Sequence, residues 1–177
     1  MRILRSILLG ILFGTLFSCA ILFRDTRVVP HYTNVDPQFK PYVNQYLFLA
    51  KMAGLKFHHT VNMGFTKMGN GNVVGITNYG LGFREVDISS EYWQYATDIQ
   101  KTILIWHELG HSYCDRNHDF GKNKPYDAEA LNRSFGPGYF MDECPVSIMY
   151  PYILDTDCWL YHYQDYVLEM FQRCDPY

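Results

Sequence analysis

The chain has 177 residues, of which 48% are hydrophobic and 19% charged, and its formal net charge is −3. This length fits one domain with its own core, and the composition excludes a mainly disordered chain. The acidic balance and the lack of a basic cluster exclude the electrostatic footprint of a nucleic-acid-binding protein. We therefore expect a single globular unit that does not bind nucleic acid.

The N-terminus, residues 1–23, predicts an export signal or an N-terminal anchor. Two arginines precede an uncharged run over residues 7–23, which is typical of secretory signals. The segment 16–19 resembles the bacterial lipobox, and that resemblance makes Cys19 a lipid-bearing residue. An uncleaved anchor is the alternative, since 17 apolar residues are at the lower limit for spanning a bilayer. Either way we expect an exported domain, secreted or attached to the cell envelope by its N-terminus or by a lipid on Cys19.

The first half of the domain predicts a linker, a helix and a small sheet. Residues 24–37 carry two prolines and are expected to form a linker arm. Apolar positions at helical spacing predict a helix over residues 38–53. Runs rich in β-branched and aromatic residues then predict strands at residues 55–59, 61–65, 73–78 and 83–88. The Gly-Asn-Gly-Asn segment, residues 69–72, is the clearest hairpin signal among them.

The second half predicts two long helices separated by a loop. Residues 91–114 have the longest helical pattern, and Ser89 or Ser90 is expected to cap it or a short helix before it. Residues 115–140 are rich in turn-forming residues, and residues 157–174 predict a closing helix. These elements predict an α+β fold in which residues 38–177 form one domain with a small mixed, twisted sheet.

Four cysteines follow Cys19, namely Cys114, Cys144, Cys158 and Cys174. An even number of cysteines in an exported domain predicts up to two disulfides, with three pairings open. A cysteine-rich metal site is the weaker alternative, because no two of the four have Cys-x-x-Cys spacing.

The pattern His-Glu-x-x-His at residues 107–111 closes the apolar run of the long predicted helix. Residues four apart on a helix share one face, so His107 and His111 can direct their imidazoles at one metal ion. Glu108 is placed to reach a metal-bound water without being a ligand. A chance match on an amphipathic helix is the alternative interpretation.

A catalytic zinc takes three protein ligands, and His118 is the candidate for the third. Here the chain resembles the metzincin metallopeptidases, which have a third histidine after the helix and a later turn with a methionine beneath the zinc. The segment Ser147-Ile148-Met149 is similar to that turn in astacins and matrixins. The chain departs from the family in having six residues between His111 and His118 instead of five, and Cys114 where the family has glycine. No tyrosine is carried over as a ligand, because Pro151 stands at the position of the astacin tyrosine.

Other interpretations of these residues stay open at this stage. His118 could be an ordinary loop histidine, and Met149 could be core filling. Glu129 could be the third ligand instead, as in the glutamate-ligated relatives of thermolysin. The remaining candidates, His58, His59 and His162, are expected to decorate a strand and the last helix.

The resemblance implies a zincin-like (metzincin) fold, a Zn²⁺ cofactor held by His107, His111 and His118, and peptide or protein substrates. It implies endoproteolysis with Glu108 as the general base. We expect the strand at residues 83–88 to pair with an extended substrate. An exported, non-catalytic zinc-binding domain is the opposing hypothesis, and nothing in the sequence indicates an oligomeric state.

Overall fold

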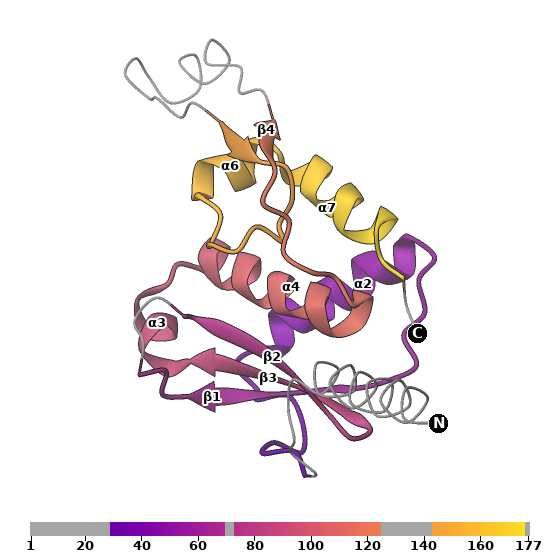
Figure 1. The fold of residues 1–177 in the computed structure, drawn as a ribbon, viewed down its shortest axis with the longest axis vertical. Coiled ribbons are helices and arrows are strands. Elements are labelled where there is room, and N and C mark those ends of the chain that lie inside the picture. The colour runs from indigo at the N-terminus through magenta and orange to yellow at the C-terminus, as the bar shows by residue number, and fades with distance from the viewer. Residues whose placement is uncertain (1–28, 70–72, 125–142, 176–177) are drawn as a thin grey trace, which may run out of the picture.

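A computed structural model describes residues 29–69, 73–124 and 143–175 of the chain, and they form an α+β fold. Figure 1 shows a small sheet on one side of the long helix α4, and the C-terminal helices on the other side. The predicted signal or anchor, residues 1–23 with Cys19, lies outside the described residues. Within the described ranges, no helix combines the length and the apolar character needed to cross a bilayer.

The three-stranded sheet consists of β1 (Val61–Thr66), β2 (Gly75–Gly80) and β3 (Phe83–Ser89) in the order β1-β3-β2. β3 is the central strand, parallel to β1 and antiparallel to β2. The hairpin is therefore the short β2–β3 connection, where Gly82 has a φ of 78°. The hairpin predicted at residues 69–72 is wrong, because the strands that it joins do not pair; residues 70–72 themselves are not described. The strand predicted at residues 55–59 does not form.

The described part of the predicted linker, residues 29–37, lies against the outer edge of β1. Val35 forms a parallel bridge with Met63, whose N–H and carbonyl bond to Asn34 and Asp36. The Tyr32 ring lies over Gly64, where a Cβ atom would come within 2.2 Å of it. This arm therefore protects the β1 edge. β2 pairs with β3 on one side only, and its outer edge has no partner strand among the described residues.

The helix predicted at residues 38–53 is α2 (Lys40–Met52), which buries Val43, Tyr46 and Ala50. The single helix predicted at residues 91–114 is instead two helices, α3 (Ser90–Tyr95) and α4 (Asp98–Cys114). They are separated because Thr97 and Gln100 form a capping box that starts a new helix. Ser89 caps α3, as the sequence predicted for a short preceding helix.

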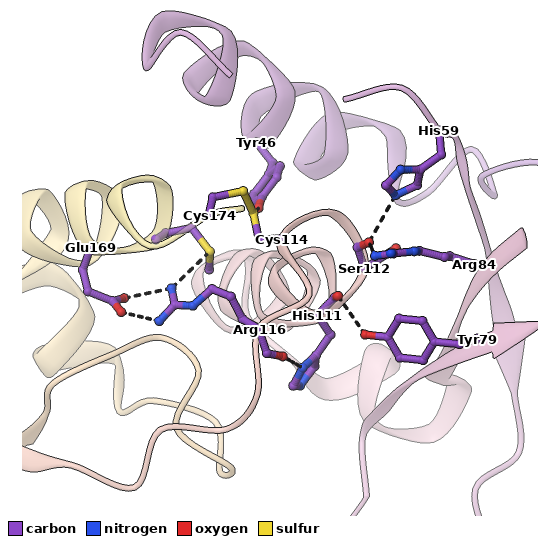
Figure 2. The surroundings of a disulfide bond; sticks show 11 residues. Tyr46, His59, Tyr79, Arg84, His111, Ser112, Cys114, Arg116, Glu169 and Cys174 are labelled. Atoms are coloured by element: carbon purple, nitrogen blue, oxygen red, sulfur yellow. Dashed lines mark hydrogen bonds and ion pairs between the residues drawn. A yellow bond between two sulfur atoms is a disulfide. The ribbon is translucent and has the colours of Figure 1, made fainter. Parts of the chain in front are cut away.

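Helix α4 is the centre of the fold, and its residues from Ile103 to Gly110 are all buried. The helix ends at Cys114 because Asp115 adopts a left-handed conformation with a φ of 50°. Its last carbonyls are bonded by sheet side chains: Tyr79 donates to His111 at 2.8 Å, and Arg84 donates to Ser112 (Figure 2). The sheet thus satisfies the end of α4 where the chain turns back.

The C-terminal part covers the side of α4 away from the sheet. Strand β4 (Lys122–Lys124), within the segment predicted as loop, pairs with β5 (Cys144–Pro145). The closing helix predicted at residues 157–174 is two helices, α6 (Thr156–Tyr161) and α7 (Tyr163–Gln172). The break falls at His162, which is both the C-cap of α6 and the N-cap of α7.

Two disulfides, Cys114–Cys174 and Cys144–Cys158, resolve which of the three pairings the fold uses. The first ties the end of α4 to Cys174, two residues after the end of α7, across a sequence separation of 60 (Figure 2). The second spans only 14 residues and holds β5 to α6.

The longer bridge is expected to contribute more to the free energy of unfolding. Loop-closure entropy predicts a loss of about 4 kcal/mol for Cys114→Ser/Cys174→Ser and about 3 kcal/mol for Cys144→Ser/Cys158→Ser. Urea unfolding of both double variants measures this difference. A non-reducing peptide map of the wild type should show the same two pairs, and free thiols at these positions would contradict the pairing.

Candidate metal centre

Three histidines converge at the C-terminal half of α4. His107 and His111 lie one turn apart on the helix, and His118 returns to them from the loop after Asp115. His107 is buried, His111 is half-buried and His118 is exposed. The chain reversal at Asp115 is therefore what brings a residue seven positions after His111 back to the helix.

The Nε2 atoms of these histidines form a nearly equilateral triangle. The distances are 3.1 Å between His107 and His111, 3.2 Å between His107 and His118, and 3.3 Å between His111 and His118. Their ligand atoms form one of the groups in the described residues that are close enough together to hold a metal ion.

The other ring nitrogens define which tautomer two of these histidines adopt. His107 Nδ1 lies 2.8 Å from the Ile148 carbonyl oxygen, and His111 Nδ1 lies 2.5 Å from the Arg116 carbonyl oxygen. A carbonyl only accepts, so each Nδ1 carries the proton and donates it. Burial, and next the neighbouring His111, lower the pKa of His107 to about 3, so this ring is neutral. The Nε2 lone pairs of His107 and His111 are left pointing toward a common position, as a metal ion requires.

Glu108 is almost completely buried, with 4% of its surface exposed, and it faces the edge strand β2. The Thr77 hydroxyl donates a 2.7 Å hydrogen bond to its Oε2 atom. Gly75 gives the carboxylate room, since a Cβ atom there would lie 2.5 Å from Oε1. Burial raises the pKa of Glu108 to about 7, against the opposing effect of the Thr77 hydrogen bond.

Met149 lies fully buried beneath the helix turn that carries the two histidines. Its side chain comes so close to Gly110 that a Cβ atom there would lie 2.5 Å from the Met149 sulfur. The preceding Ile148 supplies the carbonyl that orients His107. The segment Ser147-Ile148-Met149 therefore shapes the floor of the site without supplying a ligand.

A cleft of about 640 Å³ opens over the histidines and Glu108. One wall is β2 with the two residues before it, and the other is the segment Pro151-Tyr152-Ile153. Ile76 and Tyr152 expose 42% and 70% of their surfaces, so both walls carry accessible apolar side chains.

The structure thus brings together every predicted site residue that it describes: His107, Glu108, His111 and His118. Glu129, the alternative ligand, lies outside the described residues. No sequence pattern singled out Thr77 or Gly75, because their roles depend on the pairing of β2 with β3. His59, expected only to decorate a strand, bonds to the Ser112 carbonyl at the end of α4.

In comparisons with known proteins, no protein-family model, curated sequence or solved structure matches the chain significantly. The function of this chain is therefore inferred from the geometry of the site itself.

Proposed function

We propose that this chain is a zinc-dependent endopeptidase of metzincin type, with a zincin-like fold. The observation that carries the proposal is the triangle of Nε2 atoms, 3.1–3.3 Å on a side, beside the buried carboxylate of Glu108. Both the triangle and the carboxylate line the same cleft.

Zinc fits this donor set better than calcium or magnesium does. Tetrahedral zinc with nitrogen ligands at 2.0–2.1 Å places those nitrogens about 3.3–3.4 Å apart, close to the spacing of the three imidazoles. Calcium and magnesium prefer oxygen ligands, which the triangle lacks. Three protein ligands would leave one of the four positions of a tetrahedral zinc free, which is typical of catalytic sites. Zinc bound there would supply a Lewis acid and a water acidified toward neutral pH.

Glu108 is the general base in this proposal. Its carboxylate accepts a proton as the nucleophile forms and returns that proton to the leaving amine. The Thr77 hydroxyl keeps one carboxylate oxygen in place, and burial under β2 keeps competing water away. His107, next to Glu108 in the chain, is oriented separately by the Ile148 carbonyl.

The same arrangement predicts the effect of a methyl group at position 75. Gly75→Ala places its Cβ atom against the Glu108 carboxylate and should displace it, which lowers peptide hydrolysis by about 100-fold while zinc stays bound. Gly69→Ala is the matched control, because nothing lies within 4 Å of a Cβ atom there. Assays of hydrolysis and of zinc content for both variants test this, and an active Gly75→Ala would show that Glu108 does not need its present position.

An extended peptide would bind along β2. The strand predicted for this role, residues 83–88, cannot serve, because β3 is hydrogen-bonded on both sides within the sheet. β2 lines the cleft and has an unpaired edge within the described part of the chain, so it can add a substrate strand by backbone hydrogen bonds. The apolar side chains of Ile76 and Tyr152 then provide surfaces for substrate side chains.

Two observations bear on the alternatives. The position of His118 in the triangle supports it, rather than Glu129, as the third ligand. A non-catalytic zinc-binding domain would have no use for a buried carboxylate beside an open coordination position.

The two disulfides also support export, since such bonds persist in oxidising compartments.

Metal removal tests the proposal as a whole. Protein loaded with zinc is expected to cleave a denatured protein substrate, to lose this activity with a chelator, and to regain it when zinc is restored. Zinc binding without any cleavage would favour the binding domain, and activity that survives complete zinc removal would rule out the metal mechanism.

A further inference from the structure

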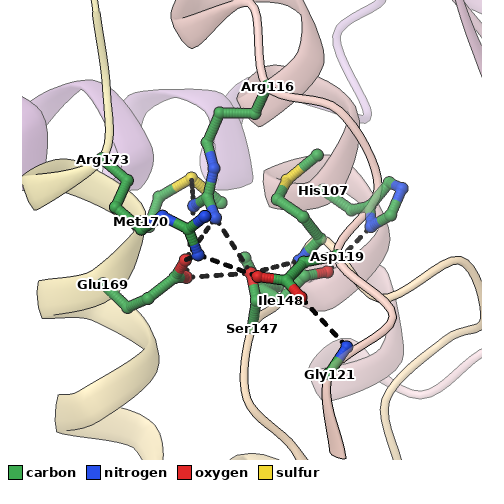
Figure 3. Close-up of polar contacts among 10 residues, drawn as sticks. His107, Arg116, Asp119, Gly121, Ser147, Ile148, Glu169, Met170 and Arg173 are labelled. Carbon is green, nitrogen blue, oxygen red and sulfur yellow. Dashed lines mark hydrogen bonds and ion pairs between the residues drawn. The ribbon is translucent and has the colours of Figure 1, made fainter.

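An ion pair between the buried Arg116 and the half-buried Glu169 links the loop of the metal centre to the C-terminal helix. Arg116, between the second and third histidines, is only 8% exposed, and its guanidinium bonds to both carboxylate oxygens of Glu169 on α7 (Figure 3). A charged pair removed from water in this way requires close geometry on both sides. Because Arg116 lies between two of the candidate ligands in the chain, the geometry of the ion pair affects the position of their loop.

The ion pair is connected to the two carbonyls that orient the ligands on α4. The Arg116 backbone carbonyl accepts from His111 Nδ1, so the residue that is tied to Glu169 also orients a histidine. Ser147 Oγ donates to Glu169 at 3.0 Å and accepts from Arg116 at 3.0 Å. The next residue, Ile148, supplies the carbonyl bonded to His107.

The third histidine is connected to the same helix through Arg173, which immediately follows α7. Arg173 bonds to Glu169 at 3.2 Å and to the Asp119 carboxylate at 2.8 Å. Asp119 directly follows His118, and its N–H donates to the Met149 carbonyl at 2.9 Å. The Glu169 carboxylate thus bonds to Arg116, Arg173 and Ser147 (Figure 3), and through them it is connected to the segments that carry or orient all three imidazoles.

We propose that Glu169 is a positioning residue for the metal centre, and that α7 aligns the three imidazoles through it. The segments that Glu169 joins, residues 115–121 and 146–149, lack helix or strand structure of their own. Two backbone hydrogen bonds join them to each other, and the side-chain bonds of Arg116 and Ser147 to Glu169 tie both segments to α7. Groups that orient metal ligands contribute strongly to affinity, because a misaligned imidazole loses part of its bond to the metal. The inference rests on the metal site of the proposed function and not on its hydrolytic step.

The first test compares two carboxylates on the same helix. Glu169→Gln should lower zinc affinity by at least about 10-fold, measured by competition with a chromogenic chelator. It should also change the visible absorption of the cobalt-substituted protein, which reports ligand geometry. Asp165→Asn, a matched change at an exposed position of α7, should alter neither quantity. Zinc affinity and a cobalt spectrum equal to wild type in Glu169→Gln would overturn the inference.

A second variant separates positioning from overall stability. Glu169→Gln leaves the buried Arg116 charge poorly paired and can therefore weaken the fold, whereas exchanging a whole buried ion pair for apolar side chains is often neutral. Arg116→Met/Glu169→Met should thus melt, without metal, close to the wild-type temperature and still bind zinc at least about 10-fold more weakly. A stable double variant with wild-type zinc affinity would overturn the inference. These measurements do not use hydrolysis. If the wild-type protein binds zinc but cleaves no peptide, and both variants bind zinc more weakly, the positioning role of Glu169 is supported and only the proposed function is contradicted.

Discussion

Glu108→Gln is expected to lower peptide hydrolysis by about 10²- to 10⁴-fold while zinc remains bound, which is the range for losing a general base. Glutamine keeps the shape of the side chain and can still accept the hydrogen bond from Thr77, so the buried site should stay packed. It has no proton affinity in the required range, so the proton-transfer role disappears. Single-turnover hydrolysis together with zinc content per chain measures both expectations.

The matched control is Glu91→Gln, which makes the same change at an exposed position of α3 remote from the histidines. It should retain full activity. If Glu108→Gln loses zinc and activity together, Glu108 has a structural role. If it keeps its activity, the proposed mechanism is wrong.

His118→Ala is expected to lower zinc affinity by at least about 100-fold, the upper end of the losses that follow from changes outside the ligand shell itself. The triangle of Nε2 atoms would keep only His107 and His111, and two imidazoles cannot hold zinc as a tetrahedral site requires. His118 is exposed and lies outside the core, so the folded domain should survive the change. Chelator competition and the melting temperature of the metal-free protein measure these two effects.

Two controls accompany this variant. His58→Ala removes an exposed imidazole away from the triangle and should leave zinc affinity unchanged. Glu129→Ala should do the same. A large loss with Glu129→Ala and none with His118→Ala would replace the three-histidine site with the glutamate-ligated one, and would reduce Met149 to core packing.

The local elements of the fold were predictable from the sequence, one helix break was missed, and the pairing of the strands could not be predicted. Helical spacing of apolar residues places α2 within two residues of its observed start, because it depends only on near neighbours. The break at Thr97 was missed because the prediction used apolar spacing alone, although Thr97 and Gln100 have the spacing of a capping box in the sequence. Strand order depends on long-range contacts, and so the central place of β3 and the edge place of β2 could not be deduced from their sequences.

The residues of the candidate site also fall into those that the sequence predicts and those that it does not. His107, Glu108 and His111 were predictable because one helix turn sets their geometry, and His118 because a short loop limits its reach. Thr77 lies 31 positions before Glu108, and Glu169 lies 53 positions after Arg116. Such contacts are set by the tertiary fold, so no spacing rule within the sequence finds them.

The proposed function requires that His107, His111 and His118 hold a zinc ion whose fourth coordination position is open to the cleft. A crystal structure of the zinc-loaded protein, with anomalous diffraction measured at the zinc edge, tests this most directly. We predict one anomalous peak within about 2.0–2.1 Å of all three Nε2 atoms, with no fourth protein ligand. A peak at other residues, or a fourth protein side chain closing the coordination shell, would contradict the account.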